Sequence, residues 1–189
     1  MQQALLETYS EADYLAEERA SATKHEYVAG EVFAMAGASK THGTLAGNAF
    51  FMLRSHLRGK PCGVWIAGMK VRIKADNAFY YPDVVVTCDT ADLRADSPED
   101  YLQAPKLVLE VLSDSTESID RREKRIAYRH LNSLEEYGLI DPKRRWIEVY
   151  RRSETGWTQN IFEGDESFRL ASVDLEVPLS ELYADTGVE

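Results

Sequence analysis

Two stretches of the chain, YYPDVVV at residues 80–86 and KLVLEVLSDST at residues 106–116, decide which fold we expect. Each contains one acid, Asp83 or Glu110, in a run of Val and Leu that is typical of a buried β-strand. Because apolar residues fill both faces of these runs, we expect both strands to lie inside a sheet. A buried carboxylate is costly to ionise unless a cation compensates its charge. The two acids therefore raise the question of what compensates them.

Side-chain alternation along a strand predicts where each acid points. Asp83 shares a strand face with Val85, and Glu110 shares one with Val108 and Leu112. Two hard oxygen ligands on adjacent strands suit Mg²⁺ or Mn²⁺, which keep water positions open and activate water for attack on phosphate. Spacing alone leaves a structural alternative, in which Asp83 only begins a strand and Glu110 lies at an exposed strand end.

A third charged residue, Lys124, lies in a segment that we predict to be helical, about 119–131. Its face of the helix also carries Asp120, Ala127, Tyr128 and Leu131, so this lysine lies along a partly apolar stripe. An inward lysine can orient a water or stabilise developing negative charge. The alternative is an ordinary Asp120–Lys124 pair on the helix surface, which is worth only a few tenths of a kcal/mol.

The remaining patterns predict a mixed α/β domain around a central sheet. We expect a hairpin around Ala29-Gly30, a loop at 88–104 and a last helical turn in PLSELY. The other expected helices are a short one at 10–19 capped by Ser10 and a long one at 41–58 capped by Ser39 or Thr41. The other expected strands are 63–67, 69–74, 79–86, 105–112, 136–140, 145–151 and 157–162.

The charge distribution is uneven. The net charge of −10 argues against a broadly basic nucleic-acid-binding protein. Residues 119–152, however, hold ten Lys or Arg against six Asp or Glu, a net of +4, so the remainder carries −14. This segment can form a local basic surface that contacts phosphate, or it can be a solvated, salt-bridged helix and hairpin.

Several features bear on the compartment. No apolar run approaches the roughly 18 residues that cross a bilayer, and the acidic start of the chain does not look like a signal peptide. Cys62 and Cys88 lack zinc-ligand spacing. We therefore expect a cytoplasmic protein with two free thiols.

Five segments together resemble the Uma-type family of endonucleases within the PD-(D/E)XK, or restriction endonuclease-like, superfamily. They occur in the family's order and are KHEYVAGEVFAM (24–35), SKTHG (39–43), YYPDVVV (80–86), LVLEVLSDSTESID (107–120) and EYGLIDPKRRWIEVY (136–150). The resemblance implies a restriction endonuclease-like α/β fold, with a central mixed sheet flanked by helices, and a single nuclease domain over residues 1–189. It also implies Mg²⁺- or Mn²⁺-dependent hydrolysis of DNA that leaves 5′-phosphate and 3′-hydroxyl ends.

One position departs from the superfamily pattern. The motif lysine is expected two residues after Glu110, where this chain has Leu112. The resemblance implies that the lysine has migrated to the following helix, at Lys124.

The resemblance also implies roles for individual residues. Asp83, Glu110 and the Val111 carbonyl are expected to bind the metal, with Lys124 and Glu31 as further catalytic residues. Glu31 can instead be a surface residue of an edge strand, and Glu26 is the less favoured acid of this hairpin. Two other residues are possible members of the site. His42 is either a proton carrier or a helix-start residue, and Asp120 is either a site acid or the helix partner of Lys124.

Other functions remain open at this point. The net charge motivates a non-catalytic module that binds nucleic acid or protein and retains the nuclease fold. A metal-free glycosidase is disfavoured because Trp65, Trp146 and Trp157 are scattered and predict no sugar cleft. An enzyme that cuts both DNA strands commonly works as a dimer, so we expect a homodimer, with residues 145–162 as one candidate interface.

Overall fold

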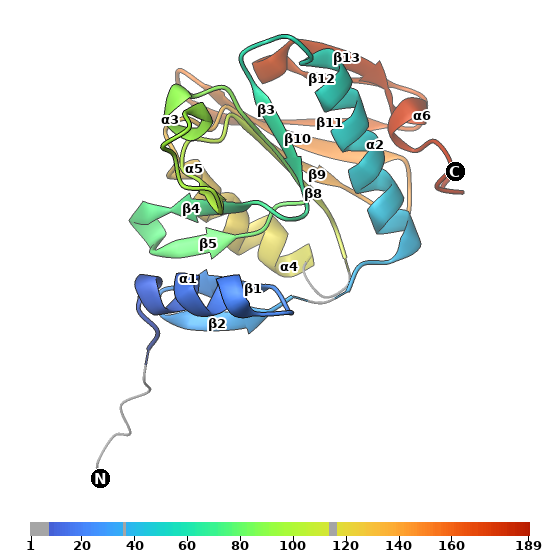
Figure 1. Ribbon diagram of the computed structural model, residues 1–189. Coiled ribbons are helices and arrows are strands. Elements are labelled where there is room, and N and C mark those ends of the chain that lie inside the picture. The colour runs from blue at the N-terminus through green and yellow to red at the C-terminus, as the bar shows by residue number, and fades with distance from the viewer. Residues whose placement is uncertain (1–7, 36, 114–116) are drawn as a thin grey trace.

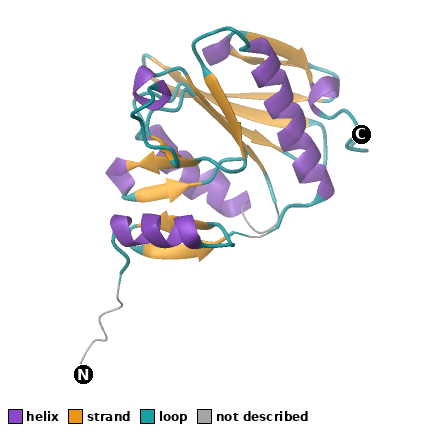
Figure 2. Cartoon of the chain, in the orientation of Figure 1, coloured by secondary structure: helices purple, strands orange, loops and turns teal. Residues whose placement is uncertain are grey.

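The computed structural model describes residues 8–35, 37–113 and 117–189 (Figure 1). Helices lie on both sides of a twisted sheet, and a second sheet lies below it in the same view (Figure 2). The helices are α1 Glu11–Ala20, α2 Lys40–His56, α3 Thr90–Leu93, α4 Glu117–Ile119, α5 Arg125–Arg129 and α6 Leu179–Leu182. A π-helical turn, η2 Asp120–Lys124, joins α4 to α5, and two 3₁₀ turns are η1 Lys74–Asp76 and η3 Ala171–Val173.

The strands form two larger sheets and one separate hairpin. In spatial order the main sheet contains β11 Gly156–Glu163, β10 Trp146–Ser153, β9 Glu136–Ile140, β8 Leu107–Val111, β6 Val84–Thr87 and β3 Gly63–Ile66. The second sheet contains β2 Glu31–Ala34, β1 His25–Val28, β5 Ala78–Tyr80, β4 Lys70–Ile73 and β7 Tyr101–Leu102. The hairpin pairs β12 Ser167–Leu170 with β13 Leu175–Pro178.

The main sheet is mixed, as predicted. β8 and β9 run parallel, whereas β8 pairs with β6 in the antiparallel sense. The two acid-bearing stretches therefore lie side by side, and both β6 and β8 have neighbours on each side. This arrangement confirms the prediction of two interior strands, which follows from the Val and Leu on both of their faces.

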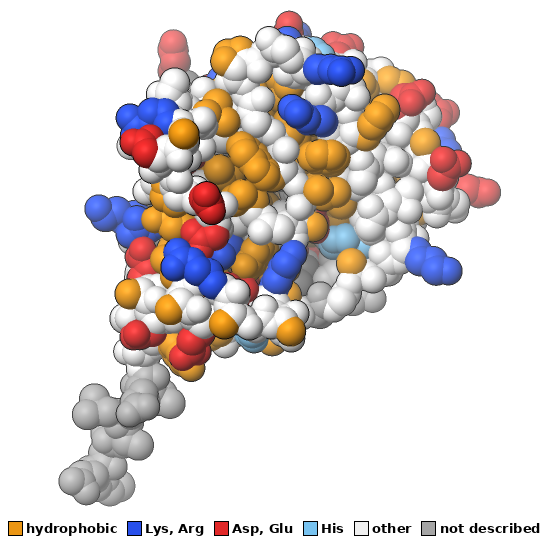
Figure 3. Space-filling model, viewed as in Figure 1, with side chains coloured by type: hydrophobic (Ala, Val, Ile, Leu, Met, Phe, Trp, Pro, Cys, Tyr) orange, Lys and Arg blue, Asp and Glu red, His pale blue; other side chains and the backbone are white. Residues whose placement is uncertain are grey.

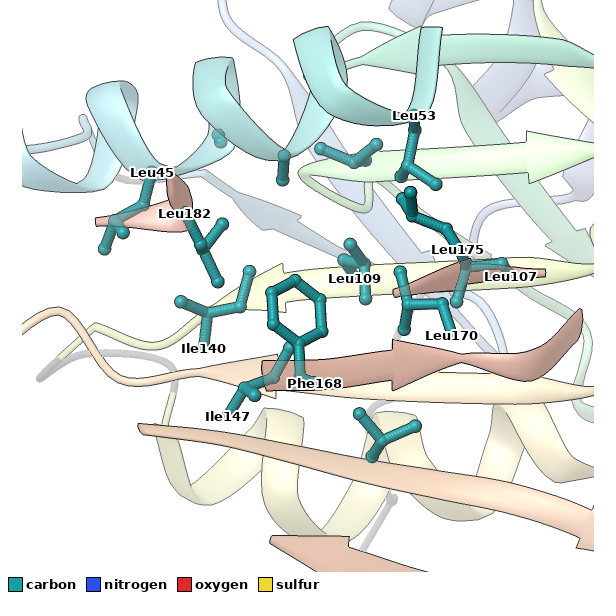
Figure 4. Close-up of a cluster of buried hydrophobic side chains, with 14 of the residues drawn as sticks. Leu45, Leu53, Leu107, Leu109, Ile140, Ile147, Phe168, Leu170, Leu175 and Leu182 are labelled. Carbon is teal, nitrogen blue, oxygen red and sulfur yellow. The ribbon is translucent and has the colours of Figure 1, made fainter. Parts of the chain in front are cut away.

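One face of the main sheet packs against α2, the β12–β13 hairpin and α6. The close-up in Figure 4 shows side chains from these elements converging on Leu109 and Ile140 of the sheet. The helix contributes Leu45 and Leu53, at the spacing expected for an apolar stripe. Phe168 fills the centre of this layer and is only 1% exposed, so the hairpin is part of the core.

The opposite face of the main sheet packs against α5 and the second sheet. Val85 and Val108 lie here with Leu112, Ala127 and Tyr128. Side-chain alternation places Val85 on the same strand face as Asp83, and Val108 and Leu112 on the same strand face as Glu110. Both acids therefore belong to the layer between the main sheet and α5.

Local signals explain how the elements begin and turn. Ser10 and Ser39 cap α1 and α2 by accepting hydrogen bonds from the Asp13 and His42 backbone N–H groups. Ala29 and Gly30 have φ values of 50° and 98°, the left-handed geometry of a two-residue hairpin turn between β1 and β2. Helix capping thus fixes the start of α2, which carries His42, and the hairpin turn fixes the end of β1, which carries Glu26.

The structure also differs from the sequence expectations. The run 79–86 forms two strands in different sheets, β5 and β6, because Tyr81-Pro82-Asp83 interrupts it. The expected loop at 88–104 contains α3 and β7, and the β12–β13 hairpin was not expected at all.

No helix among the described residues is long and apolar enough to cross a membrane.

The expectation of two free thiols is wrong, because Cys62 and Cys88 form a disulfide. Gly63 pairs with Thr87 where β3 meets β6, so the next residues along each strand, the two cysteines, come opposite one another. Neither zinc-ligand spacing nor compartment reports strand register, and register brings these two sulfurs together.

We predict that this disulfide stabilises the fold through the loop it closes. For a sequence separation of 26 residues, the loss of chain entropy corresponds to about 3.5 kcal/mol. The double variant Cys62→Ala/Cys88→Ala should therefore show a free energy of unfolding about 3.5 kcal/mol below that of the wild type in urea titrations without reductant. Two reactive thiols per chain in the unreduced, unfolded wild type would contradict the prediction.

Candidate active site

Asp83 and Glu110 lie on neighbouring strands and face the same layer. Val84 pairs with Leu109, so extending the register by one residue sets Asp83 opposite Glu110. The Val111 N–H donates to Asp83 Oδ2 over 2.7 Å and fixes that carboxylate. Glu110 is only 3% exposed, whereas Asp83 is partly exposed. One acid is thus buried, and the other lies nearer to solvent.

The Lys124 ammonium lies among three carboxylates. Its Nζ is 2.8 Å from Glu26 Oε1, 3.2 Å from Asp120 Oδ1 and 3.5 Å from Glu110 Oε1. It also lies 5.5 Å from the centroid of the Tyr80 ring. The Lys124 side chain is 5% exposed, so the lysine points inward as the helical stripe predicts.

A π-helical turn positions the two charged residues of this helix. Asp120 and Lys124 begin and end η2, and both are buried. The sequence pattern predicts one regular helix here, whereas the chain forms α4, this turn and α5 in succession. Such turns occur frequently at functional sites.

His42 joins the site from the first turn of α2. Its Nε2 lies 2.8 Å from Asp83 Oδ1. The hydrogen bond to Asp83 raises the pKa of His42 against the opposing effect of burial. The imidazole therefore holds its proton more tightly than a free histidine, and it orients the oxygen that the Val111 N–H does not bind.

The site carries more negative than positive charge. Its carboxylates are those of Glu26, Asp83, Glu110 and Asp120, and its cations are Lys124 and the histidine described above. Burial raises the pKa of Glu110 well above its usual range, although Lys124 opposes this effect. Burial lowers the pKa of Lys124, but Glu110, Glu26 and Asp120 outweigh burial and hold that pKa well above normal. The lysine stays charged, and the excess acid is only partly compensated.

The donor set fits a divalent cation. Carboxylate oxygens are the ligands that Mg²⁺ and Mn²⁺ prefer, and an added cation would relieve the excess negative charge. Asp120 Oδ1 is buried and accepts no hydrogen bond, although it lies within ion-pair distance of Lys124. Within the described ranges, no three His, Cys, Asp or Glu side chains are already arranged as a metal cluster.

The structure brings together most of the residues singled out from the sequence. Asp83, Glu110, Lys124, Asp120 and His42 form one connected cluster. Val111 adjoins the cluster through its N–H, and the role of its carbonyl stays a prediction.

The two acids of the β1–β2 hairpin differ in position. Glu31 is exposed at the start of β2, opposite Val28, and no ion pair of Glu31 is found in the described part of the chain. Glu26, the less favoured acid in the sequence, reaches Lys124 and accepts from the Tyr81 N–H over 3.1 Å. Side-chain alternation along β1 is a sequence signal that favours Glu26 as the inward acid. Glu26 and Val28 share a strand face, and Val28 packs against the cluster that contains Val85 and Val108.

Comparison with known proteins gives a consistent picture. Residues 8–180 match the model of the Uma2 family, described as "Putative restriction endonuclease". The "Uncharacterized protein slr1290" of Synechocystis sp. is 31% identical over 175 residues, which are 92% of this chain and 90% of that protein. The "Uncharacterized protein sll1609" of the same organism is 30% identical over 141 residues, covering 75% and 79% of the two chains.

A solved structure shares the fold. The crystal structure of "a putative nuclease belonging to DUF820" from Anabaena variabilis superposes with a TM-score of 0.73 at 16% identity, over 87% of this chain and 92% of that chain. At this identity the likeness speaks for the fold alone, and it confirms the predicted restriction endonuclease-like architecture.

The charge imbalance predicts that removing one buried acid stabilises the protein. Burial raises the folded-state pKa of Glu110, so the free energy of unfolding falls as pH rises from the unfolded pKa toward the folded one. Without metal at neutral pH, Glu110→Gln should therefore unfold with a free energy about 1 kcal/mol above that of the wild type. The difference should shrink as the pH approaches about 4, where the unfolded carboxyl is also protonated.

Glu136→Gln is the matched control for this prediction. Glu136 is also fully buried, but it accepts hydrogen bonds from Arg151 and from the Ala171 and Ser172 backbone N–H groups. Its loss should lower the free energy of unfolding by about 2 kcal/mol. A destabilised Glu110→Gln protein at neutral pH would show that the acids at the site are fully compensated.

Proposed function

We propose that this chain, which belongs to the Uma2 family of restriction endonuclease-like proteins, is a metal-dependent endonuclease that hydrolyses phosphodiester bonds of DNA. One observation carries the proposal: Asp83 and Glu110, on neighbouring strands, meet Lys124 in a cluster with excess negative charge. Two strand carboxylates and an inward lysine are the groups that phosphodiester hydrolysis with a divalent cation needs.

The proposed metal ligands are Asp83, Glu110 and the carbonyl of Val111. Asp83 is held by the Val111 N–H on one oxygen and by His42 on the other, which leaves lone pairs of both oxygens for a cation. Bound Mg²⁺ or Mn²⁺ would activate water and neutralise charge developing on the phosphate. His42 acts in this proposal as a positioning residue for Asp83.

Lys124 is the proposed electrostatic catalyst. Glu26, Asp120 and Glu110 keep its ammonium charged and fix its direction. A fixed ammonium at a buried site stabilises a negatively charged transition state more than it would in water, because no solvent must reorganise around it. Lys124 can equally orient the attacking water.

The proposal extends to assembly and location. We propose that residues 1–189 act as a single nuclease domain and that the active form is a homodimer, with β10 and β11 as one candidate interface. A cytoplasmic location stays a prediction, and the Cys62–Cys88 disulfide weighs against it because cytosolic thiols are usually kept reduced. The competing function is a non-catalytic binding module that retains this fold.

We predict that the two strand acids are indispensable for cleavage. In a plasmid-nicking assay with Mg²⁺ or Mn²⁺, Asp83→Asn and Glu110→Gln should each lower the rate at least about 100-fold, because each removes a charged oxygen ligand. Circular dichroism should show both variants folded. Wild-type-like cleavage by either variant would contradict the assignment, and DNA binding without cleavage under any divalent ion would favour the non-catalytic module.

The β1–β2 hairpin supplies an internal comparison between two acids. Glu26→Gln should lower the nicking rate about tenfold or more, because it frees the Lys124 ammonium from its nearest carboxylate at 2.8 Å. Glu31→Gln, five residues away and exposed, should stay within about twofold of the wild type. The reverse order of effects would restore Glu31 as the catalytic acid of this hairpin.

A further inference from the structure

A row of arginines covers a row of aromatic rings on the far side of the helix that carries Lys124. Arg121, Arg125 and Arg129 follow one another at four-residue intervals along η2 and α5. Their guanidinium carbons lie 5.1 Å from the Trp146 ring centroid, 4.8 Å from that of Tyr150, and 5.4 Å from those of Tyr150 and Trp157, respectively. We call these six residues the arginine–aromatic strip.

Strand register explains how the rings line up. Trp146 and Tyr150 alternate with Ile147 and Val149 along β10, so the rings face α5 and the aliphatic residues face α2. Trp157 of β11 pairs with Arg152 of β10 and extends the same face to the edge of the main sheet. The strip therefore runs outward from the helix to the sheet edge.

Arg125 and Arg129 carry positive charge that no carboxylate among the described residues offsets in an ion pair. Arg121 is paired with Glu117 and Glu148, whereas neither Arg125 nor Arg129 has an ion pair among the residues that the structure describes. The Nε atoms of Arg125 and Arg129 are buried and lack hydrogen-bond partners. Burial and the charge of Arg125 lower the pKa of Arg129. Two neighbouring unpaired cations are unusual on a protein of net charge −10.

The chemistry of the strip selects one kind of anion. Each ring has two guanidinium groups beside it, because Arg144 also lies 5.1 Å from the Trp146 centroid and Arg152 lies 4.7 Å from that of Trp157. The strip is therefore richer in guanidinium groups than in free aromatic faces. Guanidinium forks bind phosphate oxygens in bidentate fashion. Figure 3 shows acidic and basic side chains intermixed on one face of the molecule, with no continuous basic groove there. A local phosphate-contacting surface is consistent with a chain whose net charge is −10.

We propose that the arginine–aromatic strip, centred on Arg125 and Arg129, binds the phosphate backbone of nucleic acid outside the candidate active site. The inference deepens the proposed function, since it names the surface that holds the substrate. Lys124 and Arg125 are consecutive, and one lies among the site acids while the other lies over Tyr150. A strand held at the strip therefore lies beside the helix that supplies the catalytic lysine. Binding at the strip requires neither metal nor cleavage.

The test measures binding of a fluorescein-labelled DNA duplex by the full chain in EDTA, as a function of salt. The variant Arg125→Gln/Arg129→Gln should bind about tenfold more weakly. Its slope of log affinity against log salt should be shallower by about two, one unit for each lost phosphate contact. Arg125→Lys/Arg129→Lys should keep most of that slope, because it keeps both charges.

Arg54→Gln/Arg58→Gln is the matched control. These arginines share the four-residue spacing, are exposed, and belong to the α2 side of the main sheet. This variant should bind within about twofold of the wild type. A folded Arg125→Gln/Arg129→Gln protein with wild-type affinity and salt slope would overturn the proposal. So would a wild type that binds polyglutamate but not the duplex, which would indicate an acidic protein partner.

A second measurement does not depend on the variants folding. Saturating duplex should protect Arg125 and Arg129 of the wild type from phenylglyoxal, read by mass spectrometry, and should leave Arg54 and Arg58 unprotected. Unchanged modification of Arg125 and Arg129 would refute the strip. Protection without cleavage in Mg²⁺ would refute the proposed nuclease activity and retain the strip, whereas cleavage without protection would do the opposite.

Discussion

The Lys124 ammonium lies where the two larger sheets and a helix meet. It contacts Glu26 from the second sheet, Glu110 from the main sheet and Asp120 from its own helix. Removing the lysine from such a buried cluster would leave its carboxylates uncompensated, at a cost of several kcal/mol. One lysine thus joins the two sheets and the helix between them, and the β1–β2 hairpin is held where Glu26 can reach it.

The same cluster contains two carboxylates, those of Glu110 and Asp83, in different environments. Glu110 is buried and accepts a hydrogen bond from the Tyr128 hydroxyl over 3.4 Å, and burial raises the pKa of its carboxyl. Asp83 lies nearer to solvent, where His42 and the Val111 N–H hold it. Two acids in different environments, with more negative charge than the cations offset, are expected at functional sites, where local stability is given up.

The sequence predicted the acids and the lysine because strand and helix periodicities are local. Alternation set Asp83 with Val85 and Glu110 with Val108, and the helical stripe turned Lys124 inward. Sequence alone does not show which acid of the β1–β2 hairpin meets the helix, because that depends on the long-range pairing between β1 and β5. The Cys62–Cys88 disulfide and the division of the run 79–86 between two sheets depend on register between distant segments in the same way. The π-helical turn had no evident signal.

Calorimetric titration of Mn²⁺ into the protein shows whether Asp83 and Glu110 hold a divalent cation. We expect measurable binding by the wild type and its loss in Asp83→Ala, with both proteins folded by circular dichroism. Absence of binding by the wild type, or equal binding by the variant, would contradict this expectation. In that case Asp83 and Glu110 would hold the fold together with Lys124 and His42, and the nuclease fold would be present without metal chemistry at this site.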